Sequence, residues 1–158
     1  MEYNTNIRKH FTVSGLILNE QQRILLVYHN KLNVWLYPGG HIEENETPDE
    51  ALIREIYEET GLEVEIMGEI DESLSDIDND VTVLHKPYEI LCERIRGKDE
   101  HYHIDMVYQC KILKNTQLKF NERESKGIGF FDFNEINTIP LFPNFRNLLN
   151  KLFMSIGK

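Results

Sequence analysis

Residues 40–62 constrain the fold of this chain more than any other stretch, because they specify a short helix with a defined start and end. Thr47 is a good N-cap, and Pro48 suits the first helical position. Glu50 completes a Thr-x-x-Glu capping box. Gly61 is placed to end the helix in a left-handed cap. The sequence therefore predicts a helix between Thr47 and Gly61.

One face of this predicted helix is apolar and the other is acidic. The apolar stripe predicts that the helix lies on a sheet, and it consists of Leu52, Ile53 and Ile56. Three glutamates on the opposite face stand at i, i+3 and i+4, so their carboxylates crowd one patch: Glu55, Glu58 and Glu59. Two of them fall in the last turn, where the helix dipole disfavours negative charge by roughly 0.3–1 kcal/mol each.

The charges around this patch offer it little compensation. Residues 32–85 contain 16 Asp and Glu but a single Lys or Arg, Arg54. A solvated acidic face with salt bridges is the simpler interpretation, but no lysine stands four residues along the helix. A divalent cation would compensate the repulsion, and an all-carboxylate patch suits a hard ion such as Mg²⁺ or Mn²⁺. The residues alone therefore favour a metal site.

The same stretch resembles the signature of the Nudix hydrolases, Gly-x5-Glu-x7-Arg-Glu-U-x-Glu-Glu-x-Gly-U, where U is an aliphatic residue. All nine specified positions are filled, by Gly40, Glu46, Arg54, Glu55, Ile56, Glu58, Glu59, Gly61 and Leu62. The preceding segment 35–40 also resembles the usual lead-in of the family. Nine matches at fixed spacing form a specific signal, unlike a lone glycine motif.

The resemblance implies an α/β fold, a Nudix-type α/β/α sandwich with a mixed β-sheet, over about residues 11–133. A length of 158 residues favours one domain, 1–158. Residues 11–18 and 23–29 read as a hairpin, and residues 38–40 as a turn. Further strands are predicted over 63–70, 87–95 and 101–113, and a short strand or turn over 127–133. Residues 71–87 are predicted as a polar surface excursion, and residues 143–156 as a last helix.

For the site, the resemblance implies a metal held by Glu55, Glu58, Glu59 and the Gly40 carbonyl, with Mg²⁺ (or Mn²⁺) as cofactor. Gly39 supports the site, because adjacent glycines permit positive φ and close backbone approach. The implied reaction is metal-assisted hydrolysis of a diphosphate linkage in a nucleoside diphosphate linked to another moiety.

The catalytic roles follow from the same resemblance. Arg54 should orient a neighbouring glutamate, and Glu46 can pair with Arg54. We favour Glu55 as the base. Glu124 is the candidate on a later loop, although Gly127 stands where many members of the family carry a glutamate.

A second group of polar residues falls on one predicted strand. His101, His103 and Asp105 stand at i, i+2 and i+4, so they share one face of that strand. They are candidates for substrate or metal binding, and Arg94, near the end of the preceding strand, is a candidate for phosphate binding. The simpler alternatives are a polar sheet face and a solvated arginine.

The net charge of −10 argues against a nucleic-acid polymer as partner. The expected partner is a small nucleotide or another diphosphate. No apolar run reaches the length of a membrane span or signal peptide, so we expect a cytoplasmic protein and no membrane association. The oligomeric state stays open.

Two other classes share this fold: non-catalytic nucleotide-binding regulatory domains and isoprenoid diphosphate isomerases. The intact glutamates argue against the first class. The second would want a dedicated acid or a cysteine near the site, and neither Cys92 nor Cys110 is obviously so placed. We expect both cysteines to be reduced and packed in strands.

Overall fold

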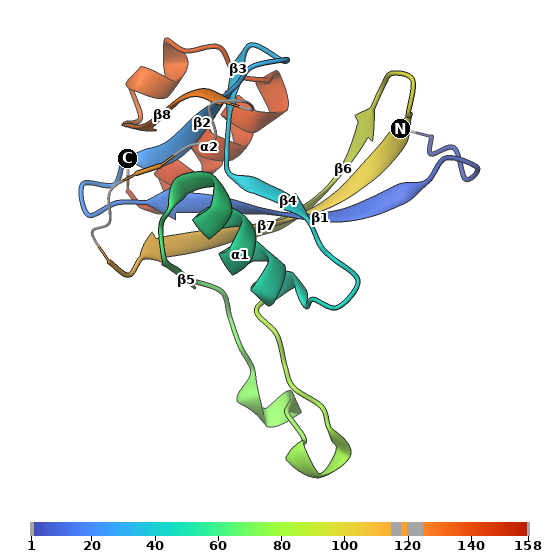
Figure 1. The fold of residues 1–158 in the computed structure, drawn as a ribbon. Helices are drawn as coiled ribbons and strands as arrows, with labels where there is room; N and C mark the ends of the chain where they lie inside the picture. The colour runs from blue at the N-terminus through green and yellow to red at the C-terminus, as the bar shows by residue number, and fades with distance from the viewer. Residues whose placement is uncertain (1, 115–117, 120–124, 158) are drawn as a thin grey trace.

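The computed structural model describes residues 2–114, 118–119 and 125–157, and these form a sheet with helices on both faces (Figure 1). The helices are α1 (Pro48–Thr60) and α2 (Pro143–Ser155), with short 3₁₀ turns η1 (Glu72–Leu74), η2 (Ile77–Asn79) and η3 (Glu135–Asn137). The strands are β1 (Lys9–Leu18), β2 (Ile24–His29), β3 (Val34–Leu36), β4 (Gly39–His41), β5 (Val64–Ile66), β6 (Glu89–Ile95), β7 (His101–Ile112) and β8 (Ser125–Phe131).

The sheet is mixed, as the resemblance implied. Its main path runs β3-β2-β1-β7-β5, while β4 pairs with β1, β6 with β7 and β8 with β2. Strands β1 and β7 are parallel along their whole contact, from Lys9↔Tyr102 to Leu18↔Lys111. The other strand pairs are antiparallel. The α/β/α architecture predicted from the sequence is confirmed.

Strand β1 is buried on both faces over residues 12–17, and this part separates two apolar cores. Val13 and Ile17 pack with α1, whereas Leu16 packs with α2. This alternation places the two helices on opposite faces of the sheet. Each fully buried Leu or Ile contributes roughly 1.5–3 kcal/mol, so α1 is held firmly against the strands that carry the site.

The predicted caps of α1 are confirmed, but one residue predicted for its apolar stripe is exposed. Thr47 and Glu50 form the reciprocal capping box, and Gly61 has a φ of 75°. Leu52 is fully buried, but Ile53 is 45% exposed, and Ala51 is buried in its place. A helix advances about 100° per residue, so the apolar face that meets the sheet leaves Ile53 at its margin.

Strands β1 and β2 form a hairpin only next to their turn. They pair antiparallel at Leu18↔Ile24 and then diverge. The middle of β1 instead pairs with β4, and β2 pairs with β3 and β8. The turn predicted over residues 38–40 is therefore wrong, because Gly39 and Gly40 extend along β1 as part of β4.

The strand predicted over residues 63–70 is also wrong in length, since β5 covers only Val64–Ile66. The reason lies in the partner strand. Strand β6 occupies the free edge of β7 from His101 to Val107, which leaves only Cys110–Ile112 for β5. The chain then leaves the sheet.

Residues 71–87 form the predicted excursion, which projects from the body as a narrow arm (Figure 1). Its base is closed by a hydrogen bond from the Lys86 amide to the Glu69 carbonyl (3.2 Å). A contact of 2.6 Å between His85 Nδ1 and Asp49 Oδ2 ties the returning chain to α1. Across the described part of the chain, no helix combines the length and apolar character that crossing a membrane requires.

Candidate active site

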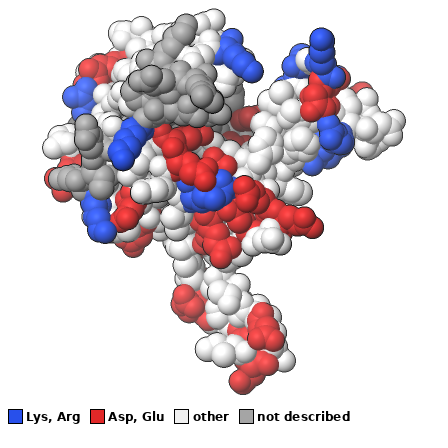
Figure 2. Space-filling view, in the orientation of Figure 1, with Lys and Arg blue, Asp and Glu red and all other residues white. Residues whose placement is uncertain are grey.

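Acidic side chains gather over α1 and the loop before it, with a basic side chain among them (Figure 2). Arg54 is the hub of this cluster. Its Nη1 donates to Glu55 Oε1 (2.9 Å) and to Glu58 Oε2 (3.2 Å). Its Nη2 donates to Glu46 Oε2 (2.8 Å) and to the His41 carbonyl (3.1 Å), and its Nε donates to Glu46.

These contacts correct the expectation that the patch lacks local compensation. Arginine presents a planar fork of donors, so a single guanidinium engages three carboxylates at once. The hydrogen bond with Arg54 lowers the pKa of Glu46 to about 2. The same hydrogen bond raises the pKa of Arg54 further above its ordinary value. One positive charge still faces the negative charges of Glu46, Glu55 and Glu58.

Glu55 is partly buried, and its side chain is only 16% exposed. Burial raises its pKa, and the hydrogen bond and charge of Arg54 oppose that rise. The backbone of Gly40 lies directly against its carboxylate, because a Cβ built on Gly40 would stand 2.5 Å from both Glu55 oxygens. A carboxyl whose pKa is raised accepts a proton more readily than an exposed one.

The two glycines confirm one expectation and correct another. Close backbone approach is present at both. A Cβ on Gly39 would overlap the Val13 carbonyl oxygen, and a Cβ on Gly40 would overlap the Glu55 carboxylate. Positive φ is absent at both Gly39 and Gly40, because pairing with β1 holds them in extended strand geometry. What these positions require is the missing side chain, not the left-handed conformation.

A cavity of about 990 Å³ opens where β1 and β2 diverge. Glu59 and Gly40 line it, so the patch on α1 borders this space. Glu93, His103 and Asp105 line it from β6 and β7. A volume near the upper end of the usual range for ligand sites is large enough for a nucleotide.

Asp105 is buried and fully engaged. It accepts hydrogen bonds from Thr12 Oγ1 (2.9 Å), from Ser14 Oγ (3.0 Å to each oxygen) and from Tyr37 OH (2.7 Å). Burial, and then the charge of Asp105, raises the pKa of Tyr37 above its ordinary value. The predicted substrate-binding residue thus carries a network that joins β1, β7 and the segment before β4.

Sequence reasoning missed Glu93, which lies opposite His103 in the β6–β7 pair. Burial, and then the neighbouring Asp105 charge, raises the pKa of Glu93 to about 7. Side chains alternate between the two faces of a strand, and this alternation could have identified Glu93. Once the register of the β6–β7 hairpin is known, Glu93 must share a face with His103 and Asp105.

We predict that Glu93→Gln stabilises the protein more at pH 8 than at pH 5. The pKa of Glu93 is 4.5 in its ordinary state and about 7 in the folded protein. At pH values between these two, the folded state therefore binds more protons than the unfolded state. The stability contributed by protonated Glu93 is therefore lost as pH rises through this window, and glutamine removes that loss. Urea midpoints at both pH values measure the effect.

The matched control for this prediction is Glu65→Gln, at an exposed glutamate on β5. An equal stability difference between Glu93→Gln and wild type at pH 5 and pH 8 would contradict the assigned ionisation.

The remaining predicted residues are the two histidines of β7, Arg94 and Glu124. His101 and His103 do lie together, with their Nε2 atoms 3.0 Å apart. Arg94 lines the cavity as well, and its Nε donates to Glu100 (2.6 Å), which pairs its charge. Glu124 lies outside the described residues. The binding roles proposed for these residues stay predictions.

The chain matches the family model described as NUDIX domain over residues 8–152. The crystal structure of "a hydrolase, NUDIX family" from Clostridium perfringens superposes with a TM-score of 0.78 at 28% identity, covering 93% of this chain and 97% of that one. An RNA pyrophosphohydrolase from Marinomonas sp. (strain MWYL1) is 42% identical over 59 residues, 35% of this chain and 37% of that protein. A "Probable DHNTP pyrophosphohydrolase" from Lactococcus lactis is 31% identical over 120 residues, 76% of this chain and 61% of that protein. The matched region thus spans less than two thirds of either curated relative.

Proposed function

This chain belongs to the NUDIX family, and from this we propose that it is a divalent-metal-dependent hydrolase acting on phosphorus-containing anhydrides. The substrate class is a nucleoside diphosphate linked to another moiety, and the bond cleaved is its diphosphate linkage. The observation that carries the proposal is the set of three glutamates on one face of α1, beside a cavity of about 990 Å³.

The residues present fit Mg²⁺ or Mn²⁺. Glu55, Glu58 and Glu59 offer only carboxylate oxygens, which hard cations prefer. Gly40 lies against the Glu55 carboxylate, so its backbone oxygen is a further candidate ligand. When bound, the ion would neutralise the diphosphate and polarise a phosphorus–oxygen bond.

Each residue of the patch has a separate role in the proposed reaction. Glu55 takes the proton from the attacking water, since partial burial favours its protonated form. Arg54 positions Glu55 through Nη1, and Glu46 positions Arg54 in turn. Glu58 and Glu59 are the principal metal ligands in this assignment, and Glu124 is the alternative base.

The partner that we propose is a small nucleotide and not a nucleic-acid polymer, because a net charge of −10 repels a polyanion. The names of the two curated relatives both refer to pyrophosphate hydrolysis, which supports a diphosphate linkage as the target. Both cysteines are free, which fits a reducing compartment such as the cytoplasm.

The cysteines also argue against the isomerase alternative. Cys110 is fully buried in the core beneath α1, and burial raises its pKa to about 12. Cys92 lies on β6. In the part of the chain that the structure describes, neither cysteine lines the cavity, so neither is placed to act on a bound diphosphate.

A substrate screen tests this proposal. Nucleoside triphosphates, dinucleoside polyphosphates, nucleotide sugars and 5′-triphosphorylated RNA are incubated with the protein and excess Mg²⁺, and released phosphate or pyrophosphate is measured. We expect turnover of at least one of the small-nucleotide classes, and turnover of the RNA alone would contradict a small nucleotide as substrate. The double variant Glu58→Gln/Glu59→Gln, purified in parallel, should lose it.

Nucleotide binding without turnover across this screen would contradict hydrolysis and favour a regulatory binding domain. Turnover that persists in the double variant would identify a contaminating phosphatase, or a site elsewhere.

A further inference from the structure

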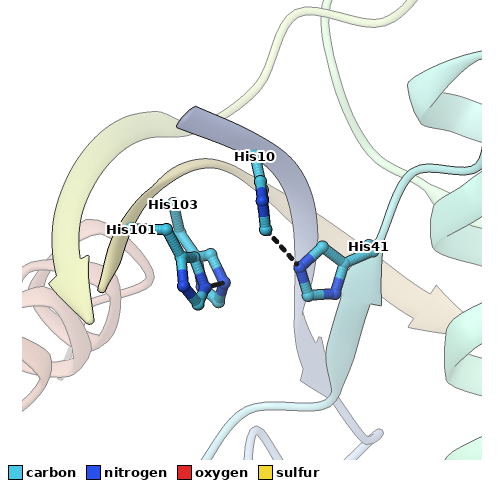
Figure 3. Close-up of side chains that lie close together, drawn as sticks. All are labelled: His10, His41, His101 and His103. Carbon is cyan, nitrogen blue, oxygen red and sulfur yellow. Dashed lines mark hydrogen bonds between the residues drawn. The ribbon is translucent and has the colours of Figure 1, made fainter. Parts of the chain in front are cut away.

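Four of the six histidines of this chain converge at one end of the sheet (Figure 3): His10, His41, His101 and His103. One ligand nitrogen from each lies within 4.8 Å of all the others. We propose that these four side chains form a second metal site, for a borderline transition-metal ion of the Zn²⁺ type, distinct from the carboxylate patch on α1.

The cluster is assembled from three strands that are distant in sequence. His10 on β1 stands opposite His103 on β7, and His41 comes from the end of β4. Figure 3 shows the four side chains gathered beside one another, with one dashed contact joining His10 to His41 and another joining His101 to His103. Convergence from β1, β4 and β7 means that the sheet itself sets the spacing of the ligands, as a preformed site requires.

The distances suit a small ion. His10 Nδ1 lies 3.3 Å from His41 Nε2, and His101 Nε2 lies 3.0 Å from His103 Nε2. Two Zn–N bonds of 2.0–2.1 Å at a tetrahedral angle place their nitrogens about 3.4 Å apart. The other nitrogen–nitrogen distances are longer, up to 4.8 Å, and rotation of the rings would shorten them, because none of the four rings is fully buried.

The chemistry of the donors separates this site from the first one. The four ligands of the cluster are imidazole nitrogens, which suit Zn²⁺, Ni²⁺ or Cu²⁺ and not the hard Mg²⁺ ion. The Nδ1 of His101 lies 2.7 Å from the Asp99 carbonyl, so it carries the proton and leaves Nε2 as the ligand atom. A backbone carbonyl that orients a ligating histidine in this way is the usual outer partner of such a metal site.

The simpler interpretation is a group of stacked rings, since the His10 and His101 rings stack with 4.3 Å between centroids and 25° between their planes. Stacking, together with the hydrogen bonds within the pairs His10–His41 and His101–His103, does not by itself require the nitrogens of both pairs to meet within 4.8 Å. The burial of His103, with His41, His101 and His10 beside it, lowers the pKa of His103 to about 4. A cation shared by the lone pairs of the four neutral rings would make this arrangement favourable.

An ion bound by the four histidines would also affect the position of residues in the carboxylate site on α1. His41 directly follows Gly40, and its carbonyl accepts from Arg54 Nη2 (3.1 Å). An ion that joins β1, β4 and β7 would therefore fix the strand that lies against Glu55. The ion acts here as a clamp on the fold, separate from the hydrolytic metal.

Cobalt binding tests the proposal. Tag-free protein, stripped of metal and held in excess Mg²⁺ to occupy oxygen ligands, is titrated with Co²⁺ while visible absorption is recorded. We expect one equivalent to bind with the intense absorption of four-coordinate Co²⁺, and Zn²⁺ to displace it. His41→Ala and His101→Ala should each weaken binding by about tenfold or more.

His29→Ala is the matched control, because it removes a histidine outside the cluster, and it should bind Co²⁺ as wild type does. Circular dichroism and urea midpoints confirm that each variant is folded. Zn²⁺ should also raise the melting temperature of wild type but not of His101→Ala.

Two results would overturn the second site. One is weak absorption typical of octahedral Co²⁺, which would assign binding to the carboxylate patch. The other is equal Co²⁺ affinity in wild type, His41→Ala and His101→Ala. Because every readout is metal binding or stability, either result leaves the proposed hydrolysis untouched.

Discussion

Glu55→Gln is expected to lower kcat by roughly 10²–10⁴ at saturating Mg²⁺, the usual range for loss of a general base. The substitution keeps the shape of the side chain and its contact with Arg54, but it removes the proton acceptor. Metal affinity should fall less than in Glu59→Gln. Steady-state kinetics with a substrate from the screen, together with Mg²⁺ titrations, separate the two effects.

Glu124→Gln is the comparison for this prediction, because it tests the alternative base. It should lower kcat much less than Glu55→Gln does. If Glu124→Gln proves the more damaging variant, Glu124 is the base and the assignment of Glu55 is wrong.

Gly40→Ala is expected to lower kcat by about 10²-fold with little change in melting temperature. The new methyl group would stand 2.5 Å from both Glu55 oxygens, so the carboxylate must move aside. Such a displacement needs only the end of a flexible side chain to shift, whereas misplacing a catalytic group by about 1 Å can cost 10²-fold in rate.

Gly39→Ala is the matched control on the neighbouring residue. There the methyl group would overlap the Val13 carbonyl, which is part of the sheet and cannot turn away. We expect this variant to lose stability, measured as a lower melting temperature. A stable but inactive Gly39→Ala, or an unfolded Gly40→Ala, would contradict the roles assigned to these two glycines.

The helix of the site could be read from the sequence because its signals are local. Thr47, Glu50 and Gly61 each act within four residues of the groups that they cap, and all three behave as predicted. The pairing of Glu46 with Arg54 was also foreseen, from the family pattern. The exposure of Ile53 was not, because it depends on how the helix sits on the sheet.

The features that sequence reasoning missed are all non-local. His10 meets His103 through the parallel pairing of β1 with β7, across 93 positions of the chain. Glu93 faces Asp105 only once the register of β6 and β7 is known. A single sequence carries no direct signal of such registers, since β-pairing is decided by contacts between distant segments.

Metal dependence is the most direct test of the central claim that the carboxylates of α1 form a hydrolytic metal site. Protein prepared free of metal is assayed in excess chelator and then after stepwise addition of Mg²⁺ or Mn²⁺. We expect no turnover without metal and full recovery with it, because the glutamates depend on the cation to neutralise and activate the diphosphate. Full turnover in excess chelator would contradict it.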